Sequence, residues 1–176
     1  MDQREKTVKK NYVYKGKIIN VRRDDAVLPD GRPCVRETVE HPGGVAVLAE
    51  HNGKIAFVKQ FRYPYGEVIL ELPAGKMEKG EQPAATALRE LSEETGLLAE
   101  SVSFVAEIYP TPGYTDERLF LYRAEGVTEG TSHPDDGEFV SVEWYTPQEA
   151  ADMIKSGIIK DAKTVVLVLS CYKFDN

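Results

Sequence analysis

Residues 75–97 read GKMEKGEQPAATALRELSEETGL, and this stretch organises the expected fold. Glu90, Glu93 and Glu94 stand three and four residues apart, which places all three on one face of a helix. Like charges at these spacings destabilise an isolated helix by about 0.2–0.5 kcal/mol per pair. Clustered oxygen ligands suit a hard divalent cation that also binds substrate phosphates. The alternative is a solvated acidic helix face, the commoner meaning of a glutamate-rich run.

The same stretch carries the signals of a helix with defined ends. Pro83 is tolerated in a first helical turn, and Gly96 is a typical helix stop. Between them, small and apolar residues recur at positions 84, 87, 88 and 91. A turn at residues 72–75 and a loop at residues 79–81 come before it, so we predict a loop, helix and loop in succession.

The spacing of these residues resembles the signature of the Nudix hydrolases. The matching positions are Gly75, Glu81, Arg89, Glu90, Leu91, Glu93, Glu94, Gly96 and Leu97. The resemblance implies a metal-dependent hydrolase of a nucleoside diphosphate linked to another group, with Mg²⁺ or Mn²⁺ held by the helix glutamates, on the order of two or three ions per site. It also implies the Nudix fold, an α/β (α+β) class in which a mixed β-sheet is sandwiched between helices.

Composition limits the classes of protein that fit. The chain has 176 residues, of which 41% are hydrophobic and 29% charged, as in a globular domain of ordinary size. A formal net charge of −7 argues against a partner such as a nucleic acid polymer, which would require a basic surface. Small phosphorylated ligands remain compatible, because a bound cation and a few arginines can reverse the local field.

The cysteines and the N-terminus favour a cytoplasmic protein. Cys34 and Cys171 are far apart and belong to no paired Cys/His spacing, so neither a zinc site nor a disulfide framework is supported. Four of the first six residues are charged and the segment has no apolar core, and the longest strongly apolar run is residues 165–169. We therefore expect no signal peptide, no membrane span and no association with a membrane.

We predict two parts along the chain. Residues 1–42 alternate polar and apolar side chains and form a small N-terminal antiparallel sheet, an arm too small to be stable alone. Residues 43–176 form the Nudix domain. It opens with the strongest hairpin signal in the chain, in which residues 45–49 pair with residues 55–59 around Asn52-Gly53.

The remaining elements fit a mixed sheet with helices on both sides. Strands are expected at residues 67–72, 102–109, 118–124 and 139–145, and a helix begins at residues 146–149. The last segment, residues 161–174, is ambiguous because its β-branched residues favour a strand by propensity. We predict a helix there, since the resembling family has a closing helix and Asp161 can cap it.

A second pattern concerns the substrate. Pro112 stands sixteen residues after Gly96, within residues 111–117, TPGYTDE. Together with the N-terminal arm, the Gln60-Phe61-Arg62 segment and the chain length, this pattern resembles the ADP-ribose pyrophosphatases. The resemblance implies hydrolysis of the pyrophosphate bond of ADP-ribose to AMP and ribose 5-phosphate. Alternatives are another nucleoside diphosphate sugar or a dinucleotide as substrate.

The resemblance also assigns roles residue by residue. The metal ligands would be the Ala74 carbonyl, Glu90, Glu93 and Glu94. Arg89 would orient a glutamate by a charge-assisted hydrogen bond. The substrate contacts would be Arg36, Glu37, Arg62, Lys76, Thr111, Pro112, Gly113 and Glu117. Without the signature, Arg62 would read as an ordinary surface arginine at the end of a strand.

The general base is the least determined assignment. The signature glutamates are committed to metal, so the base should come from a mobile loop, and residues 131–138 match the catalytic loop of the resembling enzymes. We favour Glu138, as base or as a metal ligand in the closed state, then Asp136, then Glu117.

The resemblance bears on two further points, whether the protein is catalytic and whether it forms a dimer. A non-catalytic Nudix module that only binds a nucleotide would be expected to have lost a signature glutamate, and this chain keeps Glu81, Glu90, Glu93 and Glu94. The arm, with Arg36 and Glu37 reaching the adenosine half in the neighbouring subunit's site, implies a homodimer with exchanged or packed N-terminal arms.

Overall fold

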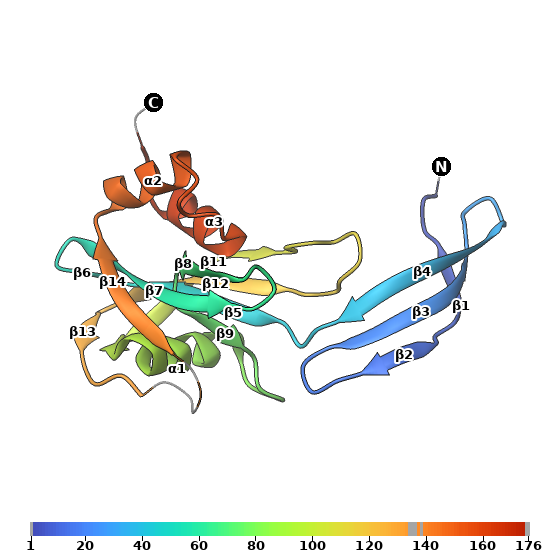
Figure 1. The fold of residues 1–176 in the computed structure, drawn as a ribbon, viewed down its shortest axis with the longest axis horizontal. Coiled ribbons are helices and arrows are strands. Elements are labelled where there is room, and N and C mark those ends of the chain that lie inside the picture. The colour runs from blue at the N-terminus through green and yellow to red at the C-terminus, as the bar shows by residue number, and fades with distance from the viewer. Residues whose placement is uncertain (1, 134–136, 138, 175–176) are drawn as a thin grey trace. The chain divides into compact units, whose positions relative to one another are not determined.

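The computed structural model describes residues 2–133, 137 and 139–174, which form two compact units. The arm unit comprises Met1–Gly43 and Tyr109–Arg118, and the main unit comprises Gly44–Ile108 and Leu119–Asn176. Figure 1 shows the elements of each unit.

The arm unit is a four-stranded antiparallel sheet, as predicted. Its central strand β3 (Asn20–Val27) pairs along one side with β1 (Lys6–Lys9) and β2 (Tyr12–Lys15), and along the other with β4 (Pro33–Glu40). Because β1 pairs near one end of β3 and β2 near the other, the two short strands share one edge of the long one.

Few side chains are buried in this sheet. Among its strand residues only Asp24 and Ala26 are buried, at 4% and 6% exposure. The guanidinium of Arg22 pairs with Asp24 at 3.1 Å and with Glu40. Large apolar side chains remain exposed, namely Val8, Tyr12, Val13, Tyr14, Ile18 and Val35.

The segment between strands β11 (Ser101–Ile108) and β12 (Leu119–Glu125) of the main unit belongs structurally to the arm unit. The Val39 N–H donates to the Tyr114 carbonyl at 2.7 Å, and the Asp116 N–H donates to the Val39 carbonyl at 3.1 Å. The Asp116 carboxylate accepts from the His41 N–H at 2.9 Å. Three backbone groups of the arm are therefore satisfied by residues more than seventy positions away.

The main unit has two four-stranded sheets. The first has the order β11 (Ser101–Ile108), β12 (Leu119–Glu125), β5 (Gly44–Leu48) and β9 (Ala74–Lys76), and it is mixed because β12 and β5 are parallel. In the second, β7 (Lys54–Arg62) pairs with β14 (Val140–Tyr145), β6 (Glu50–His51) and β8 (Glu67–Glu71). Strands β10 (Leu97–Leu98) and β13 (Thr128–Glu129) form a separate, two-stranded antiparallel sheet.

Helices cover both sides of these strands, which confirms the predicted fold class. Figure 1 shows α1 (Pro83–Thr95) on one side and α2 (Pro147–Lys155) with α3 (Ala162–Cys171) on the other. Strand β5 separates two apolar cores. Val45 and Val47 belong to the α1 core with Ala87, Leu91 and others, whereas Ala46 and Leu48 belong to the α3 core with Leu167, Val168 and others.

The predicted hairpin is correct in its turn and wrong in its pairing. Asn52 and Gly53 have positive φ angles of 51° and 75°, as a tight hairpin turn requires. Pairing across it is limited to the two residues of β6 and one further backbone bond, from the Ala56 N–H to the Ala49 carbonyl at 3.0 Å. Strand β5 instead lies between β12 and β9. All five of its residues are buried, and burial on both faces favours a position inside the mixed sheet. The predicted turn at residues 72–75 is also partly wrong, because Ala74 and Gly75 lie in β9.

The helix ends follow their predicted residues. Helix α1 starts at Pro83 and stops at Gly96, whose φ is 73°. Helix α2 has a complete capping box between Thr146 and Glu149. Asp161 caps α3 by accepting from the Thr164 N–H at 3.0 Å, so the ambiguous last segment is a helix. Within the described residues, none of the helices is long and apolar enough to cross a membrane.

Candidate active site

The helix carboxylates face the short strand β9. Glu94 is 4% exposed, and its Oε2 accepts a hydrogen bond from the Ala74 N–H at 2.9 Å. Next to it, a Cβ built on Gly75 would lie 2.0 Å from the Glu90 carboxyl carbon. A side chain at position 75 would therefore force the Glu90 carboxylate to move from its place against β9.

Arg89 binds several acidic groups of the motif. Its Nε donates to Glu81 at 3.0 Å, and its Nη1 lies 2.7 Å from Glu93 and 2.9 Å from Glu90. Its Nη2 also approaches the Lys76 carbonyl at 3.3 Å. The hydrogen bond from Arg89 lowers the pKa of Glu81 to about 2, and the bond to Glu81 raises the pKa of Arg89. One guanidinium thus offsets the repulsion among the carboxylates.

These groups supply oxygen donors for a divalent cation without forming a closed cage. Among the described residues, no three His, Cys, Asp or Glu side chains converge on one point. Mg²⁺ typically uses one or two carboxylates, keeps several waters and takes its other ligands from substrate phosphates. Glu90, Glu94 and the Ala74–Gly75 backbone are of the right chemical type for such an open site, and α1 holds them against β9.

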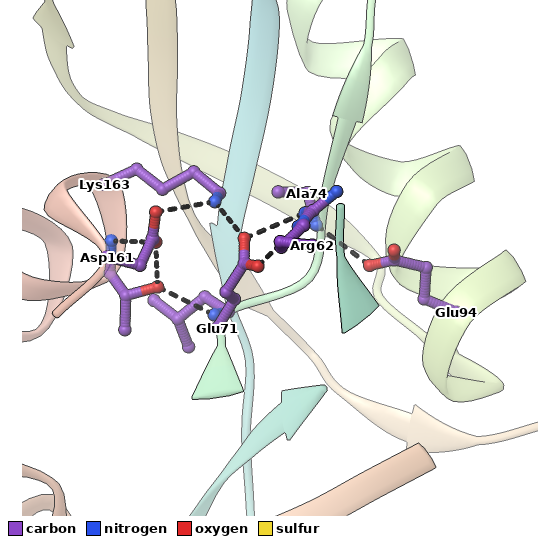
Figure 2. A network of polar contacts seen from close by, with 8 residues as sticks. Arg62, Glu71, Ala74, Glu94, Asp161 and Lys163 are labelled. Carbon is purple, nitrogen blue, oxygen red and sulfur yellow. Dashed lines mark hydrogen bonds and ion pairs between the residues drawn. The ribbon is translucent and has the colours of Figure 1, made fainter. Parts of the chain in front are cut away.

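Arg62, a predicted phosphate contact, is held by a buried carboxylate. Its Nε and Nη2 form a fork with the Glu71 oxygens at 2.6 and 2.9 Å, and Glu71 is only 2% exposed (Figure 2). Lys163 also binds Glu71 and lies 2.9 Å from Asp161. Burial alone would raise the pKa of Glu71, but the bonds from Arg62 and Lys163 outweigh burial and lower it.

Lys76 lies at the end of β9 in the main unit, and the other predicted substrate residues lie in the arm unit. Thr111, Pro112, Gly113 and Glu117 belong to its second segment, where the Glu117 carboxylate lies 3.5 Å from Nδ1 of His41. They belong to a different unit from the helix glutamates, which are part of the main unit.

Arg36 and Glu37 lie on neighbouring positions of β4 but have different surroundings. Arg36 is paired with Glu5 at 2.6 and 2.9 Å. Glu37 lines a hollow of about 330 Å³ within the arm unit, whose walls also include Arg22, Arg23 and Tyr114. The Tyr114 ring is more than half exposed and forms an aromatic wall beside charged groups.

The predicted base residues Asp136 and Glu138 lie outside the described residues. The segment before them is attached to α1. The Ser132 hydroxyl and the His133 N–H both donate to the Glu93 carbonyl, at 2.9 and 3.0 Å. This carbonyl is in the last turn of the helix, where backbone acceptors need partners from outside.

Three site residues were missed in the sequence. Glu71 and Lys163 were not identified, and Asp161 was recognised only as a helix cap. Glu71 did leave a signal, as a carboxylate within the otherwise apolar run VILEL. Lys163 left none, because a lysine in the first turn of a helix is ordinary.

Comparison with known proteins agrees with this architecture. The family model described as "NUDIX domain" matches residues 40–166. A second, "Nucleoside diphosphate sugar hydrolase N-terminal domain", matches residues 5–39.

Two relatives are equally similar in sequence. The "ADP-ribose pyrophosphatase" of Bacillus subtilis (strain 168) and the "Methanol dehydrogenase activator" of Bacillus methanolicus are each 44% identical over 167 residues, covering 93% of this chain and 90% of theirs. A solved structure titled "Crystal structure of ADP compounds hydrolase" has a TM-score of 0.85 at 17% identity, covering 96% of this chain and 92% of that one. At this identity the structural match bears on the fold alone.

Proposed function

The chain belongs to the NUDIX family, and we propose that it hydrolyses the pyrophosphate bond of ADP-ribose to give AMP and ribose 5-phosphate. The observation that carries the proposal is the intact arrangement of Glu81, Arg89, Glu90, Glu93 and Glu94 around β9. A module that only binds nucleotides would have no need for so many like charges on one helix face.

Enzymes of this family generally use divalent metals, and we propose Mg²⁺ or Mn²⁺ here. Glu90, Glu94 and the Ala74 carbonyl would hold the cation, with Glu93 as a direct or water-mediated ligand. The bound cation would neutralise charge on the diphosphate oxygens and acidify a bound water. Arg89 would keep the carboxylates ionised and oriented by its contacts with Glu90 and Glu93.

Several residues outside helix α1 would recognise the substrate. We propose that Arg62 and Lys76 contact the diphosphate and that Thr111, Pro112, Gly113 and Glu117 contact the terminal ribose. Arg36 and Glu37 would reach the adenosine half. Tyr114 in the arm hollow supplies an aromatic face suited to stacking on a base. A homodimer in which the arms pack or exchange would cover the exposed apolar side chains of β2.

The general base remains assigned to Glu138, with Asp136 and Glu117 as the next candidates. The hydrogen bonds from Ser132 and His133 to the Glu93 carbonyl support this loop as the source of the base, because they hold the start of the loop beside a candidate metal ligand. We expect Glu138→Gln to lower kcat by about 10²-fold or more, the usual contribution of a general base. A change within about threefold would move the role to Asp136 or Glu117.

The test of the function is a substrate screen with products identified. ADP-ribose, other nucleoside diphosphate sugars, NAD and dinucleoside polyphosphates would be incubated with Mg²⁺ or Mn²⁺ and analysed by chromatography and mass spectrometry. We expect AMP and ribose 5-phosphate from ADP-ribose, with the highest kcat/KM in the set. A larger kcat/KM for NAD or a dinucleotide than for ADP-ribose would identify that compound as the substrate instead. Binding without any cleavage would favour the non-catalytic module.

A further inference from the structure

Glu71 occupies an unusual position for a carboxylate. It is 2% exposed at the end of β8, and it lies between two cations, Arg62 from β7 and Lys163 from the first turn of α3. Asp161 binds the other side of Lys163 at 2.9 Å (Figure 2). The cluster therefore contains two cations and two carboxylates, and its formal charges balance.

The backbone after Glu71 is fixed at every residue up to the candidate metal site. The Leu72 N–H donates to Thr164 Oγ1 at 2.9 Å, and the Pro73 carbonyl accepts from the Val47 N–H at 2.9 Å. The Ala74 N–H then donates to Glu94. The first turn of α3 thus holds the segment that leads to Ala74, although Thr164 lies 92 residues after Leu72 in the chain.

The geometry of the fork determines how Arg62 can act. Nε and Nη2 are used by Glu71, and because a guanidinium is planar, this pairing fixes its orientation and directs Nη1 away from the carboxylate. Figure 2 shows the Arg62–Glu71 fork and the Ala74–Glu94 hydrogen bond in one view. The electrostatic influence of Glu94 on the Arg62 pKa also indicates that the fork lies near the helix carboxylates.

Lys163 shares its partner Glu71 with Arg62. It binds Glu71 Oε2, the same oxygen that accepts from Arg62 Nη2, so the carboxylate is shared between two cations. Asp161 in turn holds Lys163 in place and caps α3. A lysine that served only to attach α3 would not need to compete with Arg62 for one buried oxygen.

We propose that Lys163 is a positioning residue for the diphosphate, acting through Glu71 to hold Arg62 with its Nη1 edge available to a phosphate oxygen. The inference rests on the proposed function in that Arg62 is taken as the phosphate contact. It adds that α3, which carries none of the signature residues, takes part in diphosphate recognition.

A double-mutant cycle between Lys163 and Arg62 tests this role. We expect Lys163→Met to raise KM for ADP-ribose about tenfold while kcat stays within about threefold, and Lys163→Arg to restore most of the loss. In an Arg62→Met background, Lys163→Met should change kcat/KM by less than about twofold, because the residue through which it acts is absent. An undiminished effect in that background would overturn the proposal and leave Lys163 a structural contact of α3.

The control is Lys160→Met, which removes the same charge from an exposed position just before α3 and should leave KM unchanged. Lys163→Met leaves Glu71 with one cation fewer, so the paired change Glu71→Gln with Lys163→Met is measured as well. It removes both charges together and should fold, as judged by circular dichroism and Tm. The KM defect should persist in it, because the fork is lost; a normal KM would refute the proposal.

Binding without turnover separates this inference from the proposed function. The Kd of ADP, which carries a diphosphate whatever the true substrate is, would be measured by calorimetry in excess chelator. We expect Lys163→Met to weaken ADP binding severalfold in the wild-type background and not in the Arg62→Met background. If the wild type cleaves no ADP-ribose but this pattern holds, the proposed substrate fails and the positioning role stands. If ADP-ribose is cleaved and the pattern is absent, the positioning role fails alone.

Discussion

The main unit and the arm unit are both built largely of strands, but they bury different kinds of side chain. The main unit has two apolar cores on either side of β5, with Leu48, Ile55, Phe57 and Leu91 fully buried. The strands of the arm unit bury one alanine and one aspartate, and an arginine pairs with that aspartate. The main unit is therefore stabilised mainly by hydrophobic burial, whereas the arm depends on ion pairs, backbone pairing and its second segment.

This difference in buried side chains determines what each unit can contribute to function. The main unit can tolerate a repulsive cluster of glutamates on α1 because its cores supply stability independently of the site. The arm exposes apolar and aromatic side chains that a ligand or a second subunit can cover. A change at the candidate metal site of the main unit should therefore lower activity with little effect on stability. A change at the ion pairs of the arm should instead lower the local stability of the arm.

The largest expected effect is loss of activity from Glu94→Gln. This nearly isosteric change removes a carboxylate from the candidate metal site, and the amide oxygen can still accept from the Ala74 N–H. We expect kcat to fall by about 10²-fold or more while Tm stays within a few degrees. Kinetics with added Mg²⁺ or Mn²⁺ and a thermal melt check this. Glu100→Gln, at an exposed position of the same unit, should change neither. Full activity of Glu94→Gln would remove this residue from the site.

The second effect is local loss of stability in the arm from Arg22→Met. Asp24 would be left buried without its guanidinium partner, which typically costs about 3–5 kcal/mol. Hydrogen exchange should show faster exchange of the β3 and β4 amides, with the main unit unchanged. Arg32→Met provides the control, because its pair with Asp30 is 2.7 Å long but exposed. Equal exchange in both variants would show that Arg22 does not stabilise the arm.

A third change compares the two units as sources of a dimer interface. Val13 on β2 of the arm and Val68 on β8 of the main unit are almost equally exposed, at 62% and 63%. We expect Val13→Asp to weaken homodimerisation at least about tenfold, because a charge would enter the interface twice, and Val68→Asp to have no effect. Sedimentation over a concentration series measures both. Dissociation by Val68→Asp alone would place the interface on the main unit.

The smallest effect concerns acid stability and Glu81. Its pKa is lowered to about 2 by Arg89, so this ion pair contributes stability above the ordinary pKa of about 4.5, and the contribution is lost as the pH falls from about 4.5 to 2. Glu81→Gln should therefore lower Tm slightly at pH 7 and flatten the dependence of Tm on pH in that window. Glu78→Gln, at an exposed neighbouring position, should keep the wild-type slope. An unchanged slope for Glu81→Gln would mean that Arg89 and Glu81 are not coupled in solution.

Local sequence features determined much of the fold. The ends of α1, the capping box of α2 and the Asn52-Gly53 turn follow from residues within a few positions, because caps and turns satisfy backbone groups locally. The contact of Arg89 with Glu93 follows in the same way, since helical geometry brings residues one turn apart together.

Tertiary structure alone decided the rest. It placed β5 between β12 and β9 rather than beside β7, and it packed residues 109–118 with the arm. It also brought Arg62, Glu71 and Lys163 together from three elements spread over a hundred residues. Such contacts depend on which buried surfaces fit together and on which cationic side chains pair with a buried carboxylate. No local pattern encodes either, because the free energy comes from groups that meet only when the chain has folded.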